Sequence, residues 1–236
     1  MAISSLEKSI EYLYEVFSPY KVSGNLRERS CECCVTNEDI TRLLSKSLHE
    51  LEVNDINKFT SKAVTTFGDE QDYKHFLPRI LELVAISEDS LIDDFLTFEK
   101  LNYLEWETWN NKEIIAVDLF FYYQFENSLK NENVSIEYFN SSLELICKYK
   151  SIDTVIKIWE YNFSILSVKF IVNYVLLGSM IDLSQHQKEI LEEWFHSEYI
   201  LNQLSKQFFK EHFNEEFKER ISIVYTILEN NNKLNS

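Results

Sequence analysis

The sequence contains few of the residues that turn or interrupt a chain. Its 236 residues include 3 Gly and 2 Pro, which is too few for a sandwich or barrel of many short strands. The same scarcity argues against a glycine-lined loop for phosphate or dinucleotide groups. Hydrolase and kinase motifs and the His-Glu-x-x-His zinc motif are absent as well. The sequence therefore identifies no reaction, and it leaves open whether the protein is an enzyme.

Long uninterrupted apolar runs are also missing. The two most apolar windows, 114–125 and 163–177, contain Asp118 and Lys169, so neither predicts a membrane span. The first residues lack the basic start and the unbroken apolar stretch of a secretory signal, because Glu7 interrupts them. We therefore expect a cytoplasmic protein with reduced thiols and no membrane partner.

Positive charge is scarce. The chain has 23 Lys and Arg against 39 Asp and Glu, for a formal net charge of −16. Such a charge repels phosphate backbones and anionic lipid surfaces, so we expect no nucleic-acid partner. A basic protein partner is compatible with this charge, although solubility is a simpler reason for it.

Apolar residues recur at helical spacing through nearly the whole chain, and no alternating strand pattern bounded by turn residues is found. Capping residues at Thr36, Asp69, Ser135 and Ser184 predict helix starts. The expected helices cover 3–17, 54–66, 89–100, 110–130, 135–149, 151–161, 163–177, 185–211 and 214–230, with two more starting at 36 and 69.

Two residues predict helix boundaries. Gly68 suits the left-handed C-terminal cap of the helix at 54–66. Pro78 predicts a kink or the start of a new helix. No linker rich in Pro, Gly or Ser divides the chain. We therefore predict an all-α protein with a single multi-helix domain over 1–236, built as an irregular bundle or a short stack of helical hairpins.

The longest stretch without clear periodicity is an irregular loop at about 18–35, and it holds three of the four cysteines. Cys31 and Cys34 have the C-x-x-C spacing with which two thiolates bind one tetrahedral zinc. A second cysteine pair is absent. We therefore expect His75 or His49, in the helical region that follows, to complete a candidate zinc site.

Other interpretations of these cysteines remain open. Cys33 can replace one thiolate, although it is adjacent to Cys34 and neighbouring cysteines seldom share one mononuclear ion. In a redox site, Arg27 and Arg29 would lower a thiol pKa, but Glu28 is equally near and the β-α-β context of thioredoxin-like proteins is missing. The cysteines can also be incidental to function.

The stretch from 31 to about 82 resembles a family of bacterial proteins that have no assigned activity. One shared motif is the C-x-C-C segment before an acidic helix start. The other is a run similar to KAVTTFGD at 62–69 followed by DYKHFLPR at 72–79, with Phe67 where the family usually has Trp. Weaker similarity extends through 101–109. The resemblance covers about half of the chain and implies no mechanism.

Four polar residues of the helix that starts at Asp69 share one face. They are Asp72, His75, Arg79 and Glu82. Asp72 is placed to orient His75 as a metal ligand or base. The simpler expectation is a solvated face with salt bridges at spacings of three and four.

Two further pairs have simple structural interpretations. Trp106 and Trp109 can line a ligand pocket, but we expect them to hold a loop against the core. Glu193 and His196 have the Glu-x-x-His spacing of di-iron bundles, which is so short that chance explains it.

Two functions follow as hypotheses. The first is a cytoplasmic acidic helical protein that acts by protein–protein binding. The alternative is a zinc-binding protein with a structural or hydrolytic site built on Cys31 and Cys34, together with His75 or His49.

Overall fold

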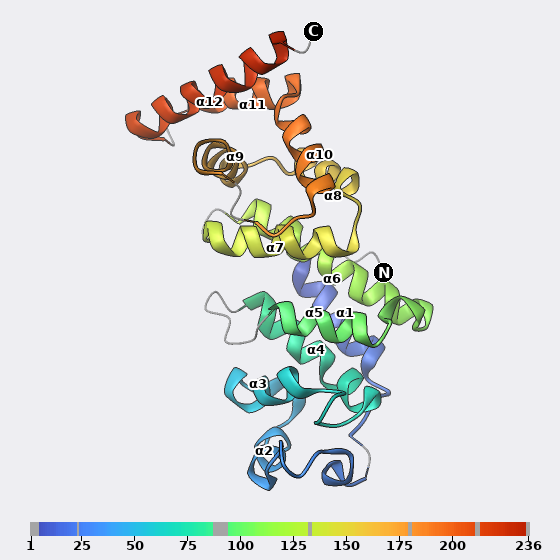
Figure 1. The fold of residues 1–236 in the computed structure, drawn as a ribbon. Helices are drawn as coiled ribbons and strands as arrows, with labels where there is room; N and C mark the ends of the chain where they lie inside the picture. Colours follow the sequence, from blue (N-terminus) through green and yellow to red (C-terminus); the bar gives the residue numbers. More distant parts are fainter. Residues whose placement is uncertain are drawn as a thin grey trace. The chain divides into compact units, whose positions relative to one another are not determined.

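The computed structural model describes residues 5–22, 24–86, 94–131, 134–178, 181–210 and 213–234, without the side chains of 94–98 and 231–234. Within these ranges the chain forms helices joined by loops, and two isolated bridges are the only β pairing (Figure 1). The structure is 75% helical. The predicted all-α fold is confirmed.

The chain groups into two compact units, Met1–Gln124 and Phe125–Ser236, called unit 1 and unit 2 below. This grouping does not test the prediction of a single domain. The α-helices of the described residues are α1 (Leu6–Phe17), α2 (Asn37–Leu43), α3 (Val53–Lys62), α4 (Glu70–Ile86), α5 (Asp94–Tyr103), α6 (Asn111–Lys130), α7 (Ile136–Tyr149), α8 (Ile152–Tyr161), α9 (Ile165–Leu177), α10 (Gln185–Phe195), α11 (Glu198–Phe208) and α12 (Glu215–Leu234). Short 3-10 helices cover Leu26–Arg29 (η1), Leu48–Glu50 (η2) and Trp106–Thr108 (η3).

In unit 1 the loop between α3 and α4 is anchored by an aromatic core. Phe67, in that loop, is buried, and its ring centroid lies 5.2 Å from that of Phe59 on α3. Phe59 also contacts Phe76 on α4, with 4.7 Å between the ring centroids. Burying three rings stabilises this arrangement by several kcal/mol, at roughly 1.5–3 kcal/mol for each side chain. The loop at 63–69 is therefore part of the core.

The two tryptophans before α6 act as a clasp. Trp106 and Trp109 are both buried, and Nε1 of Trp109 donates to the carbonyl oxygen of Leu104 at 3.1 Å. Nζ of Lys74 lies 4.1 Å from a ring centroid of Trp109 and 3.2 Å from a carboxylate oxygen of the buried Glu113. A buried cation that is paired with a carboxylate and an aromatic face is stabilised in place. These contacts favour the clasp over a ligand pocket.

In unit 2 the core is built around Trp159. Its ring centroid lies within 5.3 Å of those of Phe139, Phe170 and Trp194, which come from three other helices. Its indole N–H donates to Oγ of Ser167 at 2.7 Å, which satisfies the one polar atom of a fully buried side chain.

Three predicted helix boundaries are wrong. α3 ends at Lys62, so Gly68 does not cap it, although Gly68 has the expected positive φ of 71°. Of the two outcomes predicted at Pro78, the new helix is wrong, because α4 continues through this residue, and the kink stays a prediction. Leu77 and Ile80 beside this proline are fully buried, and that packing outweighs the lost backbone hydrogen bond.

The third error is the predicted helix at 185–211, which is two helices. Ser197 accepts a hydrogen bond from the N–H of Ile200 and caps α11, while His196 ends α10. Nδ1 of His196 lies 3.0 Å from the carbonyl oxygen of Leu228. The first residues of the expected helix at 89–100 lie outside the described residues, and α5 begins at Asp94.

Gly68 is predicted to be required for the start of α4. A Cβ atom at this position would lie 2.8 Å from Oδ2 of Asp72. Gly68→Ala therefore combines a strained backbone with a steric clash, and we expect it to lower the free energy of unfolding by about 2–4 kcal/mol. Urea denaturation followed by circular dichroism measures this change.

Gly178 provides the matched control. It has a φ of 86°, and a Cβ atom added there would have no neighbouring atom within 4 Å. Gly178→Ala should cost only the backbone strain, about 1–2 kcal/mol. Equal losses in the two variants would contradict the proposed clash with Asp72.

Candidate functional site

Three cysteines meet in the loop between η1 and α2. The sulfur atoms of Cys31, Cys33 and Cys34 all lie within 4.8 Å of one another. Sγ of Cys33 is 2.8 Å from that of Cys31 and 3.5 Å from that of Cys34. Cys33 is exposed, and the other two are partly exposed. All three are free thiols, so the loop presents a cluster of sulfur ligands at the protein surface.

A tight turn of the backbone brings these sulfurs together. The N–H groups of Cys34 and Val35 both donate to the carbonyl oxygen of Cys31, at 3.1 and 3.0 Å. The guanidinium of Arg27 donates to the carbonyl oxygens of Ser30 and Val35, at 3.2 and 2.5 Å. One side chain therefore joins the two ends of the cysteine turn. Val35 is buried, which anchors the end of the turn before α2.

The cysteine turn is also attached to the loop between α3 and α4. The N–H of Cys31 donates to the carbonyl oxygen of Thr66 at 2.8 Å, and the N–H of Gly68 donates to that of Arg29 at 3.0 Å. Nζ of Lys62 lies 3.4 Å from the carbonyl oxygen of Cys34. Because the loop at 63–69 belongs to the aromatic core, these bonds connect the exposed cysteines to a fixed part of the fold.

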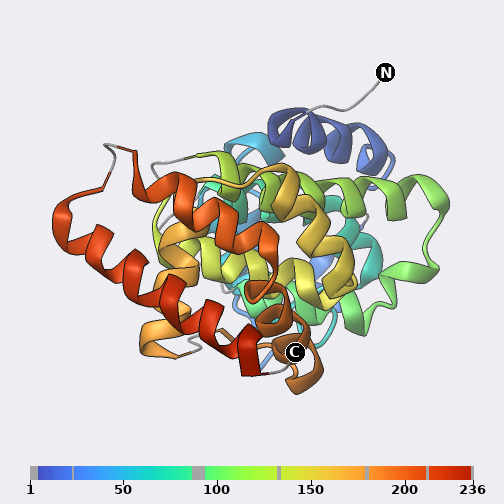
Figure 2. The same ribbon diagram turned by 90° about the horizontal axis from the view of Figure 1, so that it is seen from above.

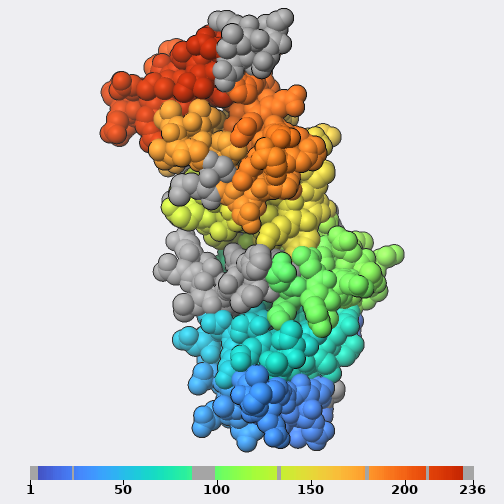
Figure 3. Space-filling view, in the orientation of Figure 1, coloured from blue at the N-terminus to red at the C-terminus, as the bar shows by residue number. Residues whose placement is uncertain are grey.

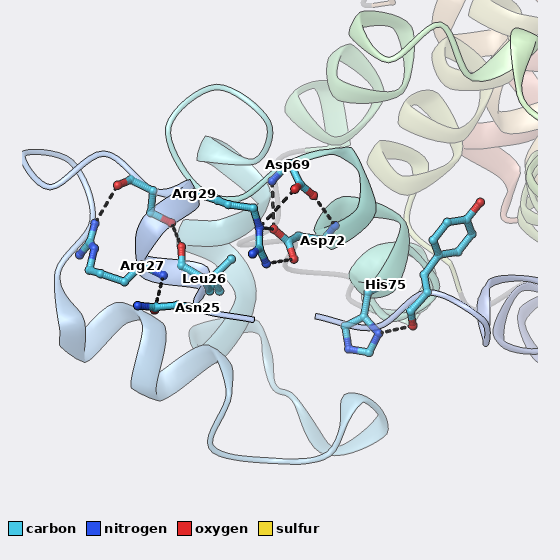
Figure 4. Close-up of polar contacts among 9 residues, drawn as sticks. Asn25, Leu26, Arg27, Arg29, Asp69, Asp72 and His75 are labelled. Atoms are coloured by element: carbon cyan, nitrogen blue, oxygen red, sulfur yellow. Dashed lines mark hydrogen bonds and ion pairs between the residues drawn. The ribbon is translucent and has the colours of Figure 1, made fainter. Parts of the chain in front are cut away.

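Arg29 and Asp72 form the main side-chain contact between the two segments (Figure 4). Nε and NH2 of Arg29 donate to the two carboxylate oxygens of Asp72, at 2.9 and 2.8 Å. The Asp72 side chain is only 1% exposed, so this is a two-bond ion pair shielded on the carboxylate side. Hydrogen bonding to Asp72 raises the pKa of Arg29.

Asp72 also helps to start α4. The N–H of Asp72 donates to Oδ1 of Asp69, and the N–H of Asp69 donates to Oδ2 of Asp72, both at 3.0 Å. This is the reciprocal pattern of a capping box. The predicted role of Asp69 as a cap is confirmed. A single buried carboxylate thus begins α4 and holds the segment that leads into the cysteines.

The three thiols differ in acidity. Hydrogen bonds from the side chain and backbone of Cys33, followed by those from Cys34, lower the pKa of Cys31. Hydrogen bonding to Cys31, and next to Cys34, raises the pKa of Cys33 to about 11. The cluster therefore favours one thiolate, at Cys31. Arg27 and Arg29, which the redox interpretation assigns to thiol activation, are bonded to backbone carbonyls and to Asp72.

Cys147 lies apart from this cluster, on α7 in unit 2. It is buried, and burial raises the pKa of its thiol to about 12. Cys147 is therefore a buried cysteine with a packing role, with which the three exposed cysteines can be compared.

The structure does not bring the two predicted histidines to the cysteines. Within the described ranges, the three cysteines form the only group of three or more candidate metal ligands, and it includes neither His49 nor His75. His49 stacks on Tyr14, with 3.9 Å between ring centroids. Nδ1 of His75 lies 3.0 Å from the carbonyl oxygen of Tyr20, and Figure 4 draws it apart from the Arg29–Asp72 pair.

The polar face of α4 is not the solvated face expected from the sequence. Asp72 is buried and bonded to Arg29, and neither of its oxygens is bonded to His75. Further along the helix, Arg79 pairs with Glu82 at the expected spacing of three, at 2.7 Å. Glu82 also accepts a hydrogen bond from the hydroxyl of Tyr14 on α1. Tertiary contacts therefore occupy this face.

Residue spacing alone does not predict Cys33 as a metal ligand. Adjacent side chains in an extended chain point in opposite directions, so spacing alone argues against Cys33 and Cys34 binding one ion. The turn closed by the carbonyl of Cys31 changes their directions and places both sulfurs beside that of Cys31. The signal in the sequence is the density of three thiols in four positions.

Comparison with known proteins finds no matching family model, no matching curated protein and no matching solved structure. The resemblance carried by the motifs at 31–34, 62–69 and 72–79 stays a prediction. Among the helices of the described residues, none has the length and apolar character needed to span a bilayer. The cysteine cluster is therefore the feature on which a function is best argued.

Proposed function

We propose that the protein binds zinc through Cys31, Cys33 and Cys34. The observation that supports this function is the convergence of three sulfur atoms within 4.8 Å on one surface turn. Thiolates are the ligands that zinc and other soft ions prefer.

The spacing of the sulfurs suits a single ion. A tetrahedral zinc with Zn–S bonds of about 2.3 Å separates its sulfurs by about 3.8 Å. The two measured separations from Cys33, 2.8 and 3.5 Å, lie below this value. Side-chain rotations that spread the sulfurs by about 1 Å would accommodate the ion. The backbone turn need not change.

Nearby positive charge favours the bound form. Three thiolates and one Zn²⁺ carry a net charge of −1, which is costly in a chain that is already acidic. Arg27 and Lys62 bond to carbonyl oxygens of Ser30, Cys34 and Val35, so two fixed cations border the cysteine turn. They lower the electrostatic cost of assembling the thiolates.

Three protein ligands leave a fourth coordination position of zinc for water or for a ligand from a partner. An open position is what a hydrolytic zinc site requires, whereas a structural site is usually closed by four protein ligands. The exposure of Cys33 makes the fourth position accessible. Cu⁺ accepts three sulfurs without a fourth ligand and is therefore the competing ion.

We expect about one zinc per chain in protein purified without chelator and under reducing conditions, measured by elemental mass spectrometry. The double variant Cys31→Ser/Cys34→Ser should lose this metal, because one thiolate does not retain zinc against buffer. Cys33→Ser should weaken binding by on the order of ten-fold or more, since it leaves two thiolates.

Cys147→Ala is the matched control and should retain the full zinc content, because Cys147 is buried on α7. If the purified protein contains copper in place of zinc, the three cysteines would still be a metal site, with Cu⁺ as its ion. Full zinc content in Cys31→Ser/Cys34→Ser would contradict the site itself.

A surface groove supports protein binding as a second function. α11 and α12 lie side by side in both ribbon views (Figures 1 and 2). The groove between them is a cavity of about 160 Å³ with a mostly apolar lining. Phe209 at its rim is 81% exposed. The residues that line it are Leu204, Ser205, Phe208, Phe209, Ile221, Ser222 and Tyr225.

The partner that we propose for this groove is the apolar face of an amphipathic helix from a basic protein. Exposed aromatic side chains beside a groove between two helices are typical of helix recognition. α12 lies at the surface, drawn in red in Figure 3. Its first turn carries Glu215 and Glu216, and the whole chain has a net charge of −16. Both charges favour a basic partner.

Phe209→Ser should abolish recovery of a basic partner that the wild-type protein retains when expressed at native level, because it removes the most exposed ring of the groove. Affinity purification with quantitative mass spectrometry measures the recovery. Tyr161→Ser is the control, because Tyr161 is 87% exposed and does not line the groove. Equal recovery with Phe209→Ser, or loss with both variants, would contradict this interface.

A further inference from the structure

A cavity in unit 1 lies between α1, η2 and α4, and its lining includes neither carboxylates nor cysteines. Its volume is about 300 Å³, which is at the lower end for small-molecule sites. The lining residues are Tyr14, Phe17, Ser18, Tyr20, Lys21, Leu48, His49, His75 and Pro78. Three of them are basic, in a protein whose net charge is −16. This cavity is called the His75 pocket below.

Lys21 supplies an unneutralised positive charge to the His75 pocket. It is exposed and forms no hydrogen bond or ion pair with any residue that the structure describes. Its charge acts on His75, whose pKa is lowered first by burial and also by Lys21. Two carboxylates near the lining are already bonded, Glu50 to Ser47 and Glu82 to Tyr14 and Arg79. Glu15, next to Tyr14 in sequence, lines a different cavity.

His75 offers the pocket one polar atom. Its Nδ1 faces the carbonyl oxygen of Tyr20 at 3.0 Å (Figure 4). A carbonyl only accepts, so Nδ1 carries the proton. Nε2 then points away from Tyr20 and has no hydrogen-bond partner among the described residues. In this tautomer Nε2 carries the lone pair and accepts, so it is available to an N–H or O–H group of a ligand and does not bond an anionic oxygen.

The rest of the lining is aromatic and flat. Tyr14 and His49 stack, with an angle of 25° between their rings, and Phe17 is almost fully buried behind them. Such walls accept a planar ring. A metal ion is disfavoured here, because Lys21 repels a cation and the lining offers no carboxylate.

We propose that the His75 pocket binds a small organic anion, in which a carboxylate or phosphate is attached to a flat ring. The anionic group pairs with Lys21, while the ring stacks on the Tyr14–His49 pair. This site is separate from the cysteine cluster, and it does not depend on zinc.

Ligands with one ring and different charges test the proposal. Ligand-observed NMR titrations of the full chain would compare benzoate, phenyl phosphate, neutral benzamide and cationic benzylamine. We expect saturable binding of at least one of the two anions, on the order of five-fold or more tighter than benzylamine. Whichever of benzoate and phenyl phosphate binds more tightly shows whether the pocket prefers a carboxylate or a phosphate. Inorganic phosphate should compete weakly, because it lacks the ring.

Lys21→Gln should weaken anion binding on the order of five-fold while leaving the fold intact, since Lys21 is exposed. Lys157→Gln, which removes the same charge from α8 in unit 2, should leave the affinity unchanged. Failure of both anions to saturate, equal affinity for benzylamine, or an unchanged affinity in Lys21→Gln would overturn the proposal.

Discussion

The cysteine site depends on one buried ion pair, between Arg29 and Asp72. These residues are 43 positions apart, and the two parallel hydrogen bonds between them hold the segment before the cysteines against the start of α4. The carboxylate of Asp72 is shielded from water, so removing Arg29 would leave a buried charge bonded only to the N–H of Asp69. Loss of one member of a buried pair typically costs about 3–5 kcal/mol.

Three positive side chains of unit 1 bond to backbone carbonyl oxygens. Arg27 closes the cysteine turn through two carbonyl oxygens, and Lys62 reaches a third. Arg79 donates to the carbonyl oxygen of Leu51 and also pairs with Glu82. The bond of Lys62 joins α3 to the cysteine turn, and that of Arg79 joins α4 to the residue after η2. Lys21 differs from these three residues, because it lines a pocket and has no hydrogen bond or ion pair with any residue that the structure describes.

The helical fold was predictable because helices depend on local signals. Apolar spacing and the scarcity of Gly and Pro predict the fold class, and the caps at Thr36, Ser135 and Ser184 are confirmed. The errors arise where tertiary contacts outweigh propensity. Pro78 is accommodated inside α4 by buried neighbours, and the break between α10 and α11 at Ser197 is marked by one capping serine in a periodic run.

The candidate site was predictable only in part. The C-x-x-C spacing points to Cys31 and Cys34, and the structure adds Cys33. The role of Asp72 could not be found from spacing, because its partner is on another segment and helical periodicity predicts a solvated face. The placement of His49 and His75 in a different pocket depends equally on long-range packing, through Tyr14 and Tyr20.

The most direct test of this account is the zinc affinity of Asp72→Asn, measured by competition with a chromophoric chelator. Asn keeps an oxygen that can cap α4 but loses the charge that Arg29 requires. With all cysteines intact, we expect zinc affinity to fall by about 10–100-fold, as for other residues that orient metal ligands. Arg29→Lys should behave similarly, because lysine cannot form the two-bond fork. Wild-type affinity in folded Asp72→Asn would contradict the claim that this ion pair positions the site.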